Sequence, residues 1–265
     1  MNSPTLMKIR MFSARFEIPR IHPSVNLVLF AILVLGALGS SSVFAQQHLS
    51  KRYPAGKNVR VELKNISGTI TVESWNRDEI KLSATLESPA AHLSPRQTGE
   101  ALIVDVVADN RGRSDVGDIN FKLQVPVNSS VDLETKSGQI TVSNIRGELV
   151  RAHVSLEGDI ELIGISASQV YAQNTIGNIF FDGEFARGGT YQFQSGKGDI
   201  TIRIPADSAF KLVAAAPNRK IALGGFWNDG IKSLGDGRKF VGDIGEGRSR
   251  VMVTNFQGSI TFIRR

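Results

Sequence analysis

Carboxylate and amide side chains follow a glycine that recurs along the second half of the chain. Asp159, Asn178 and Asp199 each stand directly after such a glycine. If the segments stack as neighbouring strands, Asp159 and Asp199 lie two segments apart, about 10 Å from each other. Inverting glycosidases use a pair of carboxylates at a slightly shorter separation as acid and base. Asp159 and Asp199 are therefore the candidate catalytic residues if the protein is an enzyme.

A structural role explains the same residues more simply. Asp and Asn side chains accept hydrogen bonds from backbone N–H groups in tight turns, and the position after each glycine is a turn position. We therefore favour the structural interpretation and predict no enzymatic activity. A polysaccharide hydrolase or lyase built on a β-helix is the alternative.

The sequence carries no other recognisable catalytic or metal-binding set. It has no cysteine, which excludes disulfides, thiolate zinc sites and thiol nucleophiles. Beyond residue 45 the histidines are His48, His92 and His153, and none belongs to an HExxH pair. The sequence also lacks a Gly-x-Ser-x-Gly nucleophile elbow. We predict no metal site and no cofactor.

Aromatic side chains are the candidate contacts for a ligand. The glycine-rich stretch 224–250 carries Phe226 and Trp227 side by side, and this pair is the candidate surface for binding a partner. Tyr171 and Tyr191 could also supply rings that stack on a sugar. The ligand suggested by these residues is a glycan or a protein of the envelope or the cell surface.

The N-terminus has the pattern of a secretory signal peptide. Basic residues come first, an apolar run extends from Leu27 to Leu38, and Val43 and Ala45 place small residues before Gln46. We predict cleavage after Ala45, which sends the mature chain to the periplasm, the cell surface or the medium. The alternative is an uncleaved N-terminal membrane anchor, for which the apolar run is short.

The charge balance argues against nucleic acid as a partner. The whole chain has 31 basic and 25 acidic residues, a net charge of +6, but without residues 1–45 the net charge falls to +3. No basic stripe with interleaved aromatic residues remains after that segment. We predict no nucleic-acid partner and no membrane span in the mature chain.

The elements that must position these side chains come from a repeat. The pattern Gly-x-Ile-x-apolar recurs with 19 to 21 residues between the glycines at 117, 138, 158, 177 and 198. It returns 60 residues later, three periods on, at 258. A second alternating stretch lies between the glycines, so one unit is two short strands joined by a turn. The repeat residues are Gly68, Ile70, Gly117, Ile119, Gly138, Ile140, Gly158, Ile160, Gly177, Ile179, Gly198, Ile200, Gly258 and Ile260.

Units of this size predict a stack. A strand pair of about 20 residues cannot bury its apolar face alone, whereas units stacked about 4.8 Å apart align their isoleucines and pair their backbones. We therefore predict an all-β, single-chain β-solenoid. Residues 1–45 are the signal peptide, residues 46–125 form an N-terminal β region that caps the stack, and residues 126–265 form the repetitive solenoid. The last two parts make one continuous domain, 46–265.

Three stretches resemble a known bacterial family. Residues 66–72, Ile-Ser-Gly-Thr-Ile-Thr-Val, resemble the SG-x-I-x-V motif of a bacterial adhesin-like domain of unknown function. The Trp-Asn-Arg-Asp that follows resembles its W-D-R motif, with Asn76 in place of the commoner aspartate. Residues 121–138 are similar to its strand and proline corner, and residues 245–260 to its closing coil, with Asn255 where a threonine is more usual. The resemblance implies an exported β-solenoid and names no catalytic residue.

These features together predict an exported, non-catalytic, adhesin-like protein that binds or scaffolds at the envelope or the cell surface. Besides the carbohydrate-active enzyme, a second alternative is a periplasmic accessory of an envelope-stress system.

Overall fold

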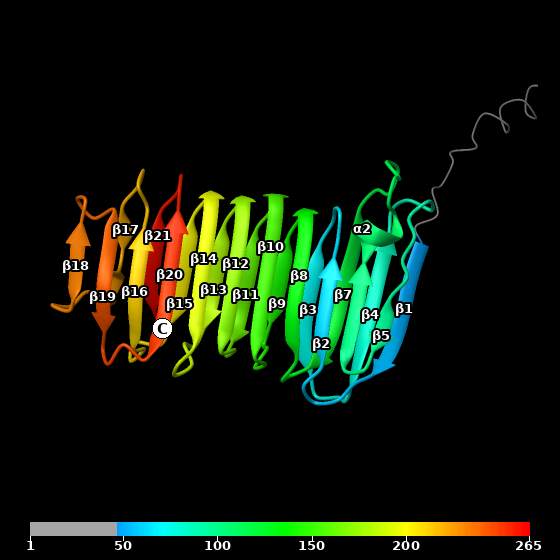
Figure 1. Ribbon diagram of the computed structural model, residues 1–265, viewed down its shortest axis with the longest axis horizontal. Coiled ribbons are helices and arrows are strands. Elements are labelled where there is room, and N and C mark those ends of the chain that lie inside the picture. Colours follow the sequence, from blue (N-terminus) through cyan, green and yellow to red (C-terminus); the bar gives the residue numbers. More distant parts are fainter. Residues whose placement is uncertain (1–46) are drawn as a thin grey trace, which may run out of the picture. The chain divides into compact units, whose positions relative to one another are not determined.

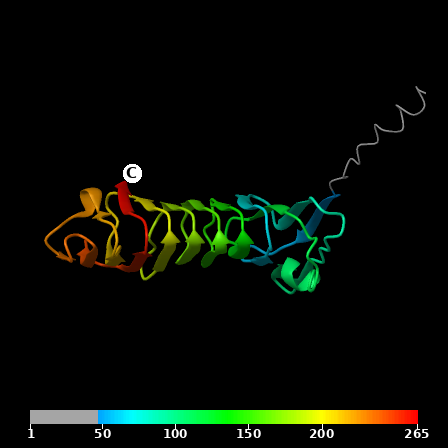
Figure 2. The same ribbon diagram turned by 90° about the horizontal axis from the view of Figure 1, so that it is seen from above.

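The computed structural model describes residues 47–265, and the predicted signal segment, residues 1–45, lies outside them. The described residues belong to a single compact unit. Its strands run side by side in two layers, which face each other across the core (Figures 1 and 2). Within the described part of the chain no helix is long and apolar enough to cross a membrane.

One layer, which we call sheet A, has ten strands, most of them parallel. In spatial order they are β1 (Gln47–Pro54), β4 (Glu79–Leu86), β7 (Ile119–Pro126), β3 (Ile70–Trp75), β9 (Ile140–Ser143), β11 (Ile160–Ile165), β13 (Ile179–Gly183), β15 (Ile200–Ile204), β21 (Ile260–Arg264) and β17 (Ile221–Ala222).

The other layer, sheet B, has eleven strands. In spatial order they are β18 (Ile231–Leu234), β19 (Lys239–Ile244), β16 (Phe210–Ala215), β20 (Ser249–Asn255), β14 (Thr190–Lys197), β12 (Gln169–Ile176), β10 (Leu149–Glu157), β8 (Ser130–Ser137), β2 (Arg60–Lys64), β6 (Ala101–Asp105) and β5 (Arg96–Thr98). The helical segments are α2 (Val106–Asp109) and the 3-10 turn η1 (Gly224–Phe226).

Each regular coil of the solenoid is one strand of sheet B, a turn at a repeat glycine and one strand of sheet A; the coil of β16 and β17 lacks the glycine. The predicted isoleucine ladder is confirmed for most copies: Ile140, Ile160, Ile179, Ile200 and Ile260 are partners in register across β9, β11, β13, β15 and β21. All five are at most 1% exposed. Side chains alternate between the core and solvent along each strand, as the two-residue period requires. The all-β solenoid is therefore the observed fold.

The glycine at each turn leaves room for the neighbouring coil. A methyl group added to Gly198 would lie 2.0 Å from the carbonyl oxygen of Gly177. Gly198 also has a φ of +128°, a conformation that a side chain disfavours. Gly138, Gly158, Gly177 and Gly258 stand in the same relation to the glycine of the adjacent coil. The turn glycines therefore form a column in which backbones touch.

The copy at Gly117 and Ile119 does not join this column, and its predicted alignment is wrong. Ile70 pairs with Phe121 and not with Ile119, so the segment is displaced by two residues. A shift of two keeps the same side chains inward, and Ile119, Phe121 and Leu123 are all at most 2% exposed. The apolar pattern alone thus permits either register.

The copy at Gly258 lies one coil from Gly198 and not three. β20 is inserted between β14 and β16, and β21 between β15 and β17, so the last coil lies inside the stack. The coil of β2 and β3 is inserted in the same way near the other end, between β6 and β8 and between β7 and β9. Near both ends of the stack, the order of the strands in space thus departs from their order in the sequence.

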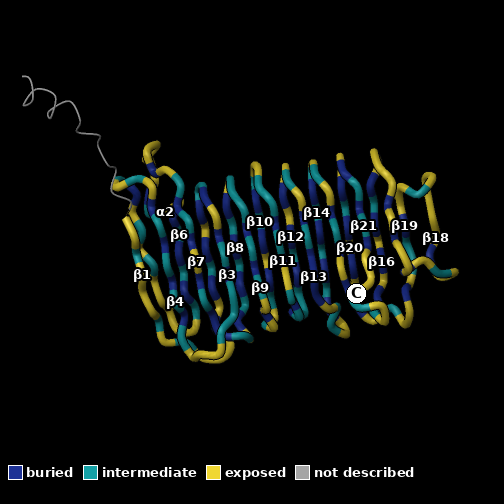
Figure 3. Tube along the Cα trace, turned by 180° about the vertical axis from the view of Figure 1, so that it is seen from behind, coloured by how far each residue is buried: buried dark blue, intermediate teal, exposed yellow. Residues whose placement is uncertain are grey.

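Antiparallel strands terminate both ends of sheet B and one end of sheet A, whose other end is the parallel strand β17. β1 pairs with β4 and β5 with β6 at one end, and β19 pairs with β16 and β18 at the other. These outer strands bury little: in Figure 3 the residues of β1 and β18 are mostly exposed, while buried residues run through the middle of the stack. Terminal repeats with a polar outer side are what a stacked architecture needs for solubility.

Candidate functional site

The post-glycine residues form a ladder of hydrogen bonds from coil to coil. The Asp159 carboxylate accepts the backbone N–H of Asn178 at 2.6 Å, and the Asn178 side-chain oxygen accepts that of Asp199 at 2.9 Å. The Asp199 carboxylate accepts both the N–H and the hydroxyl of Ser259, at 2.8 and 2.7 Å. Asp159 and Asp199 therefore bond to the turn of the next coil, with Asn178 between them.

The electrostatics of Asp199 suit this structural role. The hydrogen bonds from the Ser259 backbone and side chain lower the pKa of Asp199 below its ordinary value. A carboxylate that acts as the general acid of a glycosidase needs the opposite shift, which keeps its proton at neutral pH. The hydrogen bonds thus favour the ionised form of Asp199, which is bound to the adjacent turn.

Inside the turns runs a second polar ladder that the sequence analysis missed. Asn65, Asn174 and Asn255 each stand three residues before a repeat glycine and are at most 3% exposed. The side-chain nitrogen of Asn255 donates to the carbonyl oxygens of Gly198 and Ser259, at 2.7 and 2.9 Å. Thr135 and Ser195 occupy the same position and also donate to turn carbonyls. All five residues stand three positions before a repeat glycine, and this constant spacing is the sequence signal by which the ladder could have been predicted.

The outer face of sheet B carries a polar platform at its centre. Tyr171 and Gln192 are partners in register on β12 and β14, as are Gln173 and Gln194, and all four side chains lie on the solvent side. With Arg151 and His153 of β10, these residues line a shallow depression of about 190 Å³. We call Tyr171, Gln173, Gln192 and Gln194 the amide platform. Its three amide groups make no side-chain hydrogen bond within residues 47–265.

The charges next to the amide platform are balanced. The Arg151 side chain donates to the Asp132 carboxylate at 2.7 Å, which raises the pKa of Arg151 above its already high value. Arg60 contacts the same carboxylate from the other side at 3.7 Å. The platform is thus a nearly neutral surface of amides and one phenol.

The structure buries one residue of the predicted pair, Phe226, and exposes the other, Trp227. Phe226 is 1% exposed and packs edge-on against Phe210 and Phe262, so its assignment to the surface is wrong. It fills the core where the coil of β16 and β17 ends the stack, a place where an apolar side chain gains most by burial. Trp227 is 54% exposed and lies against Phe240. Only the tryptophan can contact a partner.

The other predicted aromatic residues also differ from each other. Tyr191 is fully buried, and its hydroxyl donates to the carbonyl of Ala167 at 2.8 Å. Tyr171 faces solvent in the amide platform. Among residues 47–265 no group of three or more histidine, aspartate and glutamate side chains is placed to hold a metal ion.

A stack of parallel strand pairs with a column of turn glycines and polar ladders defines a β-solenoid whose repeats serve structure. The chain belongs to the Toastrack DUF4097 family, whose sequence profile matches residues 35–218. This confirms the resemblance to an adhesin-like domain of unknown function.

Two solved structures similar to this chain are candidate adhesion proteins. One, a candidate cell adhesion protein from Clostridium sporogenes, shares 10% identity over 83% of this chain and 100% of its own, with a TM-score of 0.48. The other, a candidate adhesin from Bacteroides fragilis, shares 11% identity over 83% of this chain and 99% of its own, with a TM-score of 0.41. No curated protein matches the chain.

Proposed function

We propose that residues 46–265 are an exported, non-catalytic binding module of the cell envelope or surface, and that the amide platform is its glycan-binding site. The observation that supports this most is the set of amides and the tyrosine ring, held in register and free of internal hydrogen bonds. The proposal takes the mature chain to begin after Ala45, as the signal pattern of residues 1–45 predicts.

The chemistry of the platform matches that of a neutral sugar. A sugar hydroxyl both donates and accepts hydrogen bonds, and each glutamine amide offers both functions. The Tyr171 ring provides an apolar face with a polar tip, which suits the mixed surface of a pyranose. Arg151, the cation beside the ring, is paired with Asp132 and therefore does not demand an anionic ligand.

Rigidity also favours binding at this place. The platform strands β12 and β14 lie in the middle of the stack, with a paired strand on either side of each. Little backbone entropy is therefore lost when a ligand binds. Successive strands about 4.8 Å apart present equivalent groups, so the platform can contact successive units of a polymer.

A glycan-binding screen of protein expressed from the full chain tests the proposal. We expect binding to a subset of neutral polysaccharides, reduced at least tenfold by Tyr171→Ala and several-fold by Gln192→Ala. Gln124→Ala is the matched control, because this glutamine lies on the outer face of sheet A and bonds to Glu73. Absence of binding to any glycan, or binding that Tyr171→Ala and Gln124→Ala affect equally, would overturn the proposal.

The same screen separates binding from catalysis. If Asp159 and Asp199 formed a glycosidase site, the protein would release shortened sugars, and Asp199→Asn would abolish their release. We expect no release from any polysaccharide that binds. Sugar release that depends on Asp199 would show that the protein is a carbohydrate-active enzyme and would overturn the proposal of a non-catalytic binding module.

A further inference from the structure

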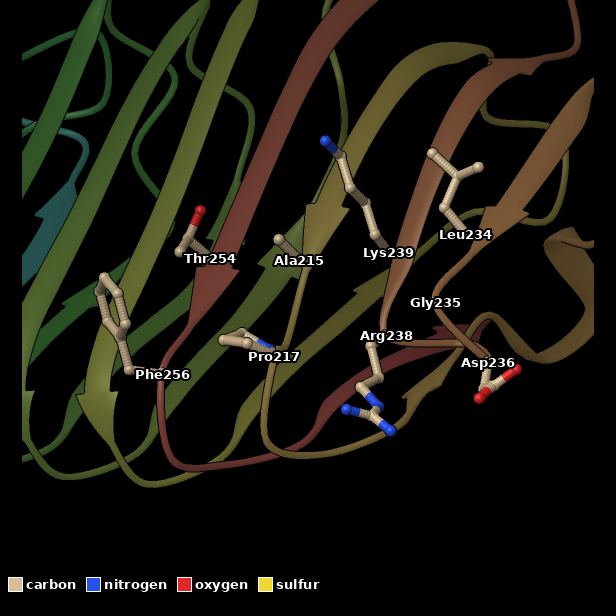
Figure 4. A pocket seen from close by; sticks show the side chains of 9 residues that line it. All are labelled: Ala215, Pro217, Leu234, Gly235, Asp236, Arg238, Lys239, Thr254 and Phe256. Atoms are coloured by element: carbon tan, nitrogen blue, oxygen red, sulfur yellow. The ribbon is translucent and has the colours of Figure 1, made fainter.

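A second concave site lies at the C-terminal end of the outer face of sheet B. It is a groove of about 590 Å³ that crosses β20, β16, β19 and the turn after β18 (Figure 4). We call it the terminal groove. Its lining residues are Ala215, Pro217, Leu234, Gly235, Asp236, Arg238, Lys239, Thr254 and Phe256.

One row of outward side chains on sheet B changes from polar to apolar beside this groove. Across the strands, the row that contains Tyr171 and Gln192 continues as Met252, Val213 and Val241. Met252 and Val213 are 43% and 39% exposed. Outward positions of a sheet are normally polar, and a contiguous exposed apolar patch marks a contact surface. The change occurs within two neighbouring strands.

Two large apolar side chains form the walls of the terminal groove. Phe256 and Leu234 are each 49% exposed. Figure 4 shows them on opposite sides, with Ala215 and Pro217 between them. A narrow apolar molecule placed along Ala215 and Pro217 would therefore touch apolar atoms on both sides and remove both walls from water.

Free positive charge stands at one side of the groove. Arg238 and Lys239 lie at the start of β19, next to Leu234, and neither forms an ion pair with another residue of the described range. Asp236 is the one acidic residue of the lining, so the groove has one excess positive charge. Figure 4 shows the Lys239 and Arg238 side chains extending in opposite directions, so either cation can pair with a carboxylate or a phosphate at its own end of the groove.

We propose that the terminal groove binds a single amphiphilic anion, a dispersed molecule with one apolar chain and a carboxylate or phosphate head. The chain lies between Phe256 and Leu234, and the head contacts Arg238 or Lys239, one at each end of the groove. This site is separate from the amide platform, so it does not depend on glycan binding.

The shape and surroundings of the groove favour one molecule over a membrane surface. Its volume lies within the range of small-molecule sites, about 300 to 1,000 Å³. The adjoining platform consists of amides, which would lose their hydration without gaining hydrogen bonds if this face lay in a bilayer. A concave apolar floor with charge at one side instead fits a single chain with a single head group.

Calorimetric titration of protein expressed from the full chain with dispersed laurate, dodecyl phosphate and dodecanol tests this proposal. We expect one laurate or dodecyl phosphate per chain, and binding of dodecanol at least tenfold weaker because it lacks the charge. Phe256→Ser and the double variant R238Q/K239Q should each weaken laurate binding about tenfold. Raising the salt concentration should weaken laurate binding and leave that of dodecanol unchanged.

Two control variants test whether any substitution of an exposed apolar or basic residue weakens laurate binding. Ile263→Ser removes an apolar side chain that is 41% exposed on the other sheet, and Lys136→Gln removes a lysine from the far part of sheet B. Both should bind laurate as the wild type does, and circular dichroism should show that every variant is folded.

Three outcomes would overturn the proposal. The first is laurate binding that Phe256→Ser and R238Q/K239Q leave unchanged. The second is capture by phosphatidylglycerol vesicles without binding of dispersed laurate, which would indicate a membrane surface. The third is a stable dimer in sedimentation that R238Q/K239Q or Phe256→Ser dissociates, which would indicate that a second copy covers the groove.

Discussion

Single side chains in the turns carry the hydrogen bonds that tie one coil to the next. Asp159, Asn178 and Asp199 accept backbone N–H groups on the outside of the turns, while Asn174 and Asn255 donate to carbonyl groups on the inside. The turn backbones lie between these two ladders and also bond directly from coil to coil, as the Gly177 N–H does to the Lys197 carbonyl. The polar residues after and before the glycine thus share one structural task.

The lowered pKa of Asp199 predicts a pH-dependent contribution to stability. Because the folded pKa lies below the unfolded value of about 3.9, the ionised carboxylate stabilises the protein above that value. This contribution is lost as the pH falls through the folded pKa. Asp199→Asn should keep an oxygen that accepts the Ser259 N–H, as Asn178 accepts the N–H of Asp199.

Thermal unfolding between pH 7 and pH 3 checks this prediction. We expect Asp199→Asn to reduce the fall in Tm on acidification relative to the wild type. Asp78→Asn is the control, since the exposed Asp78 carboxylate accepts no hydrogen bond from another described residue. Equal acid sensitivity of the wild type and Asp199→Asn would contradict the role assigned to Ser259.

Asn255 provides the corresponding test inside the turn. Asn255→Ala leaves the carbonyl of Gly198 without its donor, while that of Ser259 keeps the Ile200 N–H, and the change should cost about 2 kcal/mol of unfolding free energy. Asn255→Thr should cost less, because Thr135 at the same position of another coil donates to a turn carbonyl through its hydroxyl. Urea unfolding of both variants measures the difference in unfolding free energy. An equal loss in the two variants would show that packing, and not the hydrogen bond, determines the contribution of Asn255.

At the scale of the coil, the turn glycine decides how closely neighbours approach. Gly198→Ala should destabilise the protein by about 3 kcal/mol or more, since its methyl group would lie 2.0 Å from the Gly177 oxygen at a strained φ. Gly188→Ala is the matched control: its φ is +75°, but no atom lies within 4 Å of the added methyl group. Strain alone should cost this variant about 1 kcal/mol.

Urea unfolding at neutral pH compares the two alanine variants. The difference between them isolates the contact between coils from the backbone conformation that both glycines share. If Gly188→Ala were as harmful as Gly198→Ala, close approach of the coils would not explain the glycine column.

The sequence predicts the repeating coil well because the two-residue alternation and the glycine spacing act locally. Once the coils stack, Ile140, Ile160 and Ile179 occupy equivalent inward positions and therefore form a buried ladder. The register of Ile119 was not predictable, because a shift of two residues leaves the same faces inward. The position of the coil at Gly258 was not predictable either, since spacing along the chain does not say where a coil is inserted.

The candidate sites were harder to predict for related reasons. Phe226 and Trp227 are adjacent apolar residues in one loop, and only the three-dimensional end of the core determines that the first is buried. Gln173 and Gln194 have no distinctive motif and become a site through pairing across β12 and β14. A sheet-borne binding face is thus a property of register between coils, which composition does not contain.

At the scale of the whole molecule, insertion of the first and last coils determines where the stack can open. In a solenoid whose coils follow the sequence, the final coil lies at the end and frays first. Here β20 and β21 are paired on both sides, and the outermost strands are β1, β5, β17 and β18. Ile260 and Thr261 are therefore held by β15 and β17 together, while residues 262–264 pair with β15 alone.

Native-state hydrogen exchange of the full chain measures how easily the inserted strands open compared with the outermost strands. Backbone amides of β20 and of Ile260 and Thr261 in β21 should exchange about as slowly as those of β12 and β13, because opening them requires both neighbouring coils to separate. Amides of β18 and of β1 should exchange much faster, since each strand is paired on one side and buries few side chains. Rapid exchange throughout residues 249–264 would contradict the insertion, because it would place the last coil at a free end. Slow exchange there, with fast exchange in 231–234, would show that the strands beside the terminal groove open first.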